Sequence, residues 1–175
     1  HADVALALCR EAQLTKRNDL RLLIMSATMD LPELSAKLQA KIIQSEGKQY
    51  PVAIHYMGAT DMHLLPELTA RVVIKASKAN KGDILVFLPG QAEIIGCKEL
   101  LEGKLANTVI HTLYGQLPFA QQQAALLPDV DGKRKVVLAT SIAETSLTIE
   151  GVTTVVDSGF GKRSKFDPES GLSRL

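Results

Sequence analysis

The stretch at residues 136–149 joins a short apolar run to a segment that is rich in hydroxyl groups and carries one carboxylate. The run Val-Val-Leu-Ala is typical of a buried strand. Ligands in an open parallel sheet lie beyond the carboxyl ends of the strands. We therefore expect a ligand-facing edge carrying Thr140, Ser141, Thr145, Ser146 and Thr148. The alternative is a turn whose hydroxyls satisfy only their own backbone.

Strand-like and helix-like segments alternate along the chain, which is typical of βαβ units and predicts an α/β fold with a parallel sheet. Helices are predicted at 2–17, 31–40, 62–79, 91–105 and 118–127, and strands at 21–25, 41–44, 52–56, 83–88, 108–113, 135–139 and 152–157. The irregular stretch 45–51 is the predicted boundary between two lobes. Residues from 164 onward are expected to form a hairpin.

The helix predicted at 62–79 has an apolar face at helical spacing, formed by Leu65, Leu68, Val72 and Ala76. We interpret this face as core packing.

The composition and net charge of the chain limit the classes of function that it can have. The 175 residues are 46% apolar and 22% charged, which is enough apolar material for a hydrophobic core. A net charge of +1 excludes the large basic excess of a dedicated nucleic-acid coat. Nucleic-acid contacts must therefore be local, and basic residues cluster at 133–135 and 162–165. Such clusters are often solvated faces, but both lie near the hydroxyl-rich stretch in the sequence.

The cysteines and histidines show no ligand spacing. Cys9 and Cys97 are far apart, and we expect both to be reduced, buried apolar side chains of a cytoplasmic protein. No metal site made of protein ligands alone is expected from the four histidines. No apolar segment approaches the roughly 18 residues of a membrane span, so no membrane partner is expected. The first residue is His1, which suggests a fragment of a longer protein.

Four segments occur in a fixed order. They are Ser-Ala-Thr at 26–28, Ile-Leu-Val-Phe-Leu-Pro-Gly-Gln-Ala-Glu-Ile at 84–94, Leu-Tyr-Gly-Gln-Leu-Pro at 113–118 with a triple Gln at 121–123, and Thr-Ser-Ile-Ala-Glu-Thr-Ser-Leu-Thr-Ile at 140–149. These segments resemble motifs III, IV, IVa and V of the DEAH-box helicases of superfamily 2, closest to the bacterial HrpB type. A single Ser-Ala-Thr is weak evidence for this family, whereas four motifs in the family's order are specific evidence for it. The resemblance implies RecA-like lobes of the P-loop NTPase type, with residues 1–48 ending lobe 1 and residues 49–175 forming most of lobe 2.

The same resemblance implies roles for individual residues. It implies that Ser26 and Thr28 couple the nucleotide site to the other lobe. It implies contacts to single-stranded nucleic acid from Thr140, Ser141, Gly115, Gln116, Lys162 and Arg163. It implies contacts to the nucleotide, chiefly its ribose and phosphate-side water, from Ser146, Thr148 and Glu150. At Ser141 the family usually has Asn, a mild change if the backbone makes the contact. Leu126 stands where many members carry an aromatic ring that stacks on the nucleotide base.

The resemblance implies a fragment of an ATP-dependent RNA helicase, which couples hydrolysis of ATP or another NTP with Mg²⁺ to movement along single-stranded RNA. DNA is an open alternative as the ligand, and the protein is expected to be a cytoplasmic monomer. The chain contains no Gly-x-x-x-x-Gly-Lys-Ser/Thr phosphate loop. It also lacks the family's acidic motif II and arginine-rich motif VI. We therefore expect the fragment alone to be inactive.

Two other classes remain open at this point. A non-catalytic Rossmann-like binding module would explain the alternating pattern and the small net charge, but not the four ordered motifs. A doubly wound enzyme acting on a small molecule would need a nucleophile and base at recognisable spacing, and none is found. The glycines at 159 and 161 do not form Gly-x-Gly-x-x-Gly.

Overall fold

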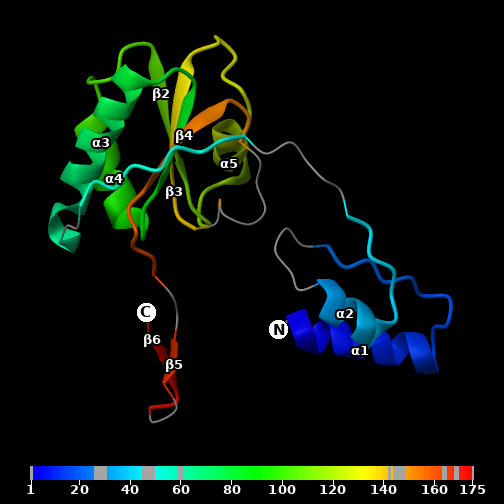
Figure 1. Ribbon diagram of the computed structural model, residues 1–175. Helices are drawn as coiled ribbons and strands as arrows, with labels where there is room; N and C mark the ends of the chain where they lie inside the picture. Colours follow the sequence, from blue (N-terminus) through cyan, green and yellow to red (C-terminus); the bar gives the residue numbers. More distant parts are fainter. Residues whose placement is uncertain are drawn as a thin grey trace. The chain divides into compact units, whose positions relative to one another are not determined.

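A computed structural model describes residues 2–25, 31–44, 50–58, 61–141, 143, 149–162, 165–167 and 170–174 (Figure 1). The chain divides into two compact units, His1–Ile54 and His55–Leu175. Among the described residues, the helices are too short or too polar to cross a lipid bilayer.

The first unit contains two helices, α1 (Ala2–Thr15) and α2 (Leu31–Leu38). Both were predicted, although each ends about two residues early. The predicted strands at 21–25, 41–44 and 52–56 are wrong, because these described residues have no regular structure. A strand exists only with a paired neighbour, and none of the three segments pairs within the described residues. Their apolar side chains accordingly stay in solvent: Leu23 is 77% exposed and Ile43 is 90% exposed.

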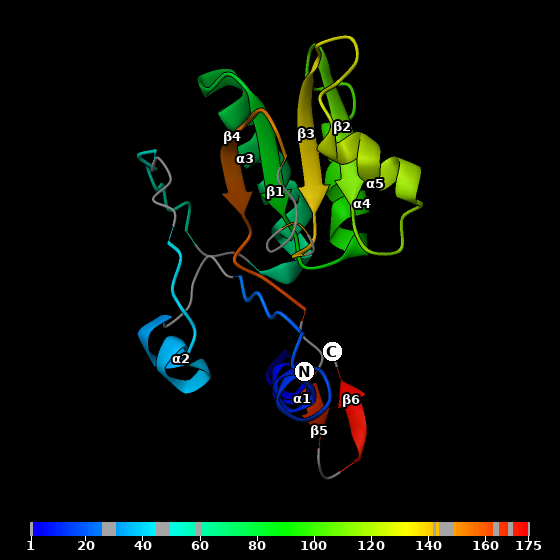
Figure 2. The same cartoon turned by 90° about the vertical axis from the view of Figure 1, so that its right-hand side faces the viewer.

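The second unit is built on a four-stranded parallel sheet with the order β2-β3-β1-β4 (Figure 2). Its strands are β1 (Asp83–Phe87), β2 (Thr108–Leu113), β3 (Arg134–Ala139) and β4 (Val152–Asp157). Its helices are η1 (Met62–Leu64), α3 (Leu65–Ala79), α4 (Gln91–Leu101) and α5 (Phe119–Leu126). The predicted α/β fold with a parallel sheet is confirmed, and its four strands lie within one residue of their predicted bounds.

Helices cover both faces of the sheet, and this explains the continuous apolar runs of the central strands. On one face, Ile84, Val86, Val136 and Leu138 pack with residues of α3 and α4. On the other face, Val137 and Ala139 pack with Ala125 of α5. Figures 1 and 2 show α3 and α4 on one side of the sheet and α5 on the other.

The buried face of α3 is displaced from the predicted one. Its buried side chains are Leu65, Thr69, Ala70 and Val73, whereas Leu68 and Val72 are only half-buried. The helix packs against both α4 and the sheet. Two neighbours therefore bury a face about one residue away from the stripe that hydrophobicity alone predicts.

A short hairpin is formed by β5 (Lys165–Asp167) and β6 (Leu172–Arg174), which pair antiparallel. Its turn is closed by the Ser170 hydroxyl, which donates to Asp167 Oδ2 at 2.7 Å. The predicted hairpin is confirmed.

The two cysteines should differ sharply in reactivity. Cys97 is fully buried in α4, and burial raises the pKa of its thiol to about 12, whereas Cys9 is exposed on α1. The predicted burial is therefore confirmed for Cys97 and wrong for Cys9. Because the thiolate is the reactive form, a maleimide at neutral pH should label Cys9 rapidly and Cys97 only after denaturation. Mass spectrometry of labelled wild-type chain and of the Cys9→Ser variant would check this. Rapid labelling of the folded Cys9→Ser chain would contradict the burial of Cys97.

Candidate nucleotide and nucleic-acid interface

The carboxyl edge of the sheet, where the chain leaves Phe87, Leu113, Ala139 and Asp157, brings several predicted site residues together. Leu113 of β2 and Ala139 of β3 are register partners, so the residues after them emerge side by side. The Thr140 N–H donates to the Leu113 carbonyl oxygen at 3.1 Å and fixes this arrangement. Thr140 is half-buried, and Ser141, Gly115 and Gln116 are exposed. Two predicted phosphate-binding loops therefore lie next to each other on neighbouring strands.

The ends of β1 and β4 join the same edge. The Leu88 N–H donates to the Ala139 carbonyl oxygen at 2.8 Å, and the Ser158 N–H donates to the Phe87 carbonyl oxygen at 3.2 Å. The Gln91 side chain, at the start of α4, donates to Tyr114 Oη at 3.3 Å. This bond links the loop after β1 to the loop after β2. Sequence reasoning gave neither residue a role, although both lie inside quoted motifs.

The loop after β3 turns directly back onto the sheet. The Ala143 N–H donates to the Thr140 carbonyl oxygen at 3.2 Å, and Ala143 is buried in the second core cluster. Further along, Ile149 packs against the same cluster and Glu150 is exposed. Several predicted site residues lie outside the described residues, so their roles stay predictions: Ser26, Thr28, Thr145, Ser146, Thr148 and Arg163.

Leu126 is the last residue of α5 and is half-buried. It packs against the same core cluster as Ile149, so the end of α5 and the end of the hydroxyl-rich loop share one apolar support. At the other end of the helix, the Gln122 side-chain amide donates to the Leu117 carbonyl oxygen at 2.7 Å. The helix α5 thus connects the Gly115–Gln116 loop to Leu126.

Lys162, a predicted nucleic-acid contact, already has an acidic partner. Its Nζ lies 3.3 Å from Glu93 Oε2, and the two side chains are 45% and 15% exposed. The ammonium passes close over Gly90, where an added Cβ would lie 2.6 Å from Nζ. The role of Lys162 toward a nucleic acid stays a prediction, and in this structure its partner is Glu93. Arg163 lies outside the described residues.

The basic cluster at 133–135 is not placed as predicted. It lies at the amino edge of the sheet, because β3 runs from Arg134 to Ala139 and so carries the chain away from the cluster before the hydroxyl-rich loop begins. Lys133 pairs with Asp131 at 3.0 Å, and Lys135 is 1% exposed. The interpretation of this cluster as a basic patch beside that loop is wrong. The cluster and the loop are close in sequence, but they lie at opposite ends of β3 and so at opposite edges of the sheet.

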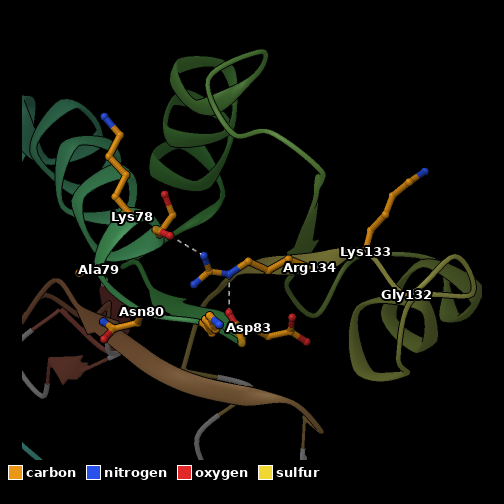
Figure 3. A pocket seen from close by; sticks show the side chains of 10 residues that line it. Lys78, Ala79, Asn80, Asp83, Gly132, Lys133 and Arg134 are labelled. Atoms are coloured by element: carbon orange, nitrogen blue, oxygen red, sulfur yellow. Dashed lines mark hydrogen bonds between the residues drawn. The ribbon is translucent and has the colours of Figure 1, made fainter.

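A shallow pocket of about 540 Å³ lies at the amino edge (Figure 3), lined by residues 77–83 and 132–134. Arg134 donates to the carbonyl oxygens of Ser77, at 2.7 Å, and Gly82. Figure 3 shows Lys78 and Lys133 pointing away from the Arg134 guanidinium. The Arg134 guanidinium in this pocket is engaged by main-chain carbonyls at the end of α3 and before β1. Arg134 anchors α3 to β3, and the carboxyl edge remains the candidate site.

The profile of the helicase conserved C-terminal domain family matches residues 61–170, which include the sheet and its carboxyl edge. The chain belongs to this family. Two curated relatives extend the comparison. The ATP-dependent RNA helicase HrpB of Escherichia coli is 43% identical over 176 residues, covering 99% of this chain and 22% of that protein. The pre-mRNA-splicing factor ATP-dependent RNA helicase prp22 of Schizosaccharomyces pombe is 40% identical over 168 residues, covering 91% of this chain and 14% of that protein.

Solved structures agree with the sequence comparison. The crystal structure of the E. coli DEAH/RHA helicase HrpB matches with a TM-score of 0.89 at 42% identity, over 99% of this chain and 22% of that one. A crystal structure of the E. coli DExH-box NTPase HrpB matches with a TM-score of 0.84. The predicted resemblance to DEAH-box helicases and the RecA-like fold are confirmed. The chain spans about a fifth or less of the length of these curated relatives, 22% and 14%.

Proposed function

We propose that this chain is part of a longer ATP-dependent RNA helicase, in which residues 1–48 end one RecA-like lobe and residues 49–175 form most of the next. The observation that carries the proposal is the meeting of the Thr140 and Gly115 loops at one edge of a helicase-family sheet. The two curated relatives are both named ATP-dependent RNA helicases, and the small share of each that the chain covers supports a longer protein.

We propose two groups of residues with different ligands, one for the nucleic acid and one for the nucleotide. On the nucleic-acid side we place Thr140, Ser141, Gly115, Gln116, Lys162 and Arg163. On the nucleotide side we place Leu126, Ser146, Thr148 and Glu150, with Ser26 and Thr28 coupling that site to the first lobe. Hydroxyls and backbone N–H groups hold a phosphate chain independently of base identity, as a translocating enzyme requires. Alternate closing and opening of the two lobes would then advance the strand.

The described residues offer a surface for the base of a nucleotide, but they offer no cluster of ligands for a metal ion. Leu126 and Ile149 offer apolar surface for a base. No group of three His, Cys, Asp or Glu side chains is placed to hold a cation in the described part of the chain. We propose that ATP or another NTP binds with Mg²⁺, and that the metal is held by residues outside this chain. Bound Mg²⁺ would neutralise charge on the phosphates.

The proposed partner is single-stranded RNA, and the proposed setting is a cytoplasmic monomer. DNA is the alternative ligand, because contacts to phosphates do not distinguish the two, whereas contacts to 2′-hydroxyl groups do.

Replacing Thr140 by valine in the longer helicase tests the proposal. A hydrogen bond to a charged group contributes about 1.5–3 kcal/mol, so affinity for single-stranded RNA should fall about 10-fold to 100-fold. Fluorescence anisotropy with a labelled oligonucleotide measures this. Thr108→Val, at the amino edge, is the matched control and should leave affinity unchanged. Equal affinities for wild type and Thr140→Val, or equal losses in both variants, would contradict the proposed phosphate contact.

Selectivity among nucleotide bases should be weak. Leu126 offers apolar contact without ring stacking, so the longer helicase should use ATP, GTP, CTP and UTP with similar kcat/KM. The matched variant Leu126→Phe should lower KM, since base–aromatic stacking is worth about 1–3 kcal/mol per base. Phosphate release with each NTP under saturating RNA measures both effects. A strict requirement for ATP in the wild-type protein would contradict this role of Leu126.

A further inference from the structure

Lys135 is a buried cation in the central strand β3, with 1% of its surface exposed. Its Nζ donates to the carbonyl oxygens of Leu127 at 2.6 Å and Ala125 at 3.3 Å, and lies 3.5 Å from that of Leu126. Asp83 Oδ2 is 3.9 Å away, and Asp83 Oδ1 accepts the Lys135 N–H at 2.8 Å. Burial of an ammonium costs several kcal/mol unless it is paired and hydrogen-bonded. The ammonium is therefore stable here only because these oxygens surround it.

The three carbonyl groups belong to the end of α5. The last carbonyls of a helix have no partner within the helix, and they form its negative end. The last turn of α5 contains no basic residue of its own, and its one main-chain cap is the Leu127 N–H, which donates to the Gln123 carbonyl oxygen at 3.0 Å. A helix of eight residues is too short to be stable alone. Lys135 supplies from β3 the cation that α5 lacks.

The end that Lys135 holds is the end that carries Leu126. Since Nζ reaches the main chain on both sides of this residue, the position of the Leu126 side chain depends on the position of the ammonium. The other end of α5 is tied to the Gly115–Gln116 loop through Gln122 and Leu117. A shift of α5 would therefore move a nucleotide contact relative to the sheet.

We propose that Lys135 is a positioning residue of the nucleotide site: its ammonium clamps the carboxyl end of α5 and so sets where Leu126 meets the nucleotide base. The inference rests on the proposed function, which places Leu126 beside the base. A methionine at this position would fill a similar volume but leave the three carbonyl groups without their donor.

His111 of β2 provides a local reporter of the clamp. Burial lowers the pKa of this imidazole, and the positive charge of Lys135 lowers it further. Removal of that charge should move the pKa of His111 upward, toward its ordinary value. An NMR titration of the imidazole in wild type and Lys135→Met measures this shift. Because loss of burial would raise the pKa of His111 as well, circular dichroism of the same variant checks separately that the fold is retained.

The test is a double-mutant cycle in the longer helicase, with Lys135→Met, Leu126→Ala and the double variant. Steady-state hydrolysis under saturating RNA gives KM and kcat for ATP, and thermal unfolding gives Tm. We expect each single variant to raise KM about 10-fold, with a smaller change in kcat. In the Leu126→Ala background, Lys135→Met should add little to KM, because the clamped side chain has already gone. Lys133→Met, two residues before Lys135 and exposed, is the matched control and should leave KM unchanged.

A purely structural role for Lys135 gives a different pattern. Lys135→Met would then lower Tm and the active fraction while leaving KM unchanged. Alternatively, its effect on KM would multiply with that of Leu126→Ala. Either result overturns the proposal that Lys135 positions Leu126. If Leu126→Ala alone leaves KM unchanged, the placement of Leu126 in the proposed function fails, and the clamp fails with it. If Lys135→Met does not fold, Lys135→Gln replaces it. Its amide retains donors, so a KM raised about 3-fold supports the clamp and an unchanged KM overturns it.

Discussion

Replacing Leu138 by alanine should lower the free energy of unfolding of this chain by about 2–5 kcal/mol. Leu138 is fully buried in β3, in the cluster formed by the sheet, α3 and α4. Truncation removes apolar contacts and leaves a cavity, because strands on both sides limit how far the site can collapse. A loss of this size is a large fraction of the total stability of a typical domain.

Urea unfolding followed by circular dichroism measures the change, since the chain contains no Trp for fluorescence. The control is Val130→Ala, because Val130 is 98% exposed and its truncation should alter stability by less than about 0.5 kcal/mol. Similar losses in the two variants would contradict the placement of Leu138 in the core.

The strands of the second unit could be predicted because their residues carry the signal themselves. Strands β1 and β3 lie inside a sheet covered by helices on both faces, so each reads as an apolar run. The segments 21–25, 41–44 and 52–56 have similar apolar content but form no strands. Pairing depends on a neighbour that is distant in sequence, and local composition does not encode it.

The candidate site could be predicted to the same extent. The rule that ligands lie beyond the carboxyl ends of parallel strands predicted a ligand-facing edge at Thr140, and the resemblance to the helicase motifs added Gly115. The register of Leu113 with Ala139 places the two loops together. The bond between Gln91 and Tyr114 could not be predicted, because it joins residues 23 positions apart. Lys135 was misinterpreted for a related reason. A lysine at the start of an apolar run is expected to face solvent. The sequence does not show that the end of α5 packs over Lys135 and accepts hydrogen bonds from its ammonium.

The chain by itself should hydrolyse no NTP, whereas the longer helicase should do so. Phosphoryl transfer requires cations and backbone donors positioned around the phosphates. The chain contains no Gly-x-x-x-x-Gly-Lys-Ser/Thr sequence to cradle them, and no arginine-rich motif VI. In the proposed function, the residues at the carboxyl edge contact a base, a ribose or a nucleic-acid phosphate, and none of them is assigned to the transferring phosphoryl group.

The measurement is phosphate release by the purified 175-residue chain with ATP, Mg²⁺ and single-stranded RNA, beside the longer helicase as the positive control. We expect release no faster than in buffer, because electrostatic stabilisation of the transition state is usually the largest single contribution to catalysis and this chain lacks its source. The variant Ser146→Ala separates true turnover from contamination. Turnover by the chain that is lost in Ser146→Ala would be genuine, and it would contradict the proposal that the carboxyl edge is one half of a nucleotide site completed by another lobe.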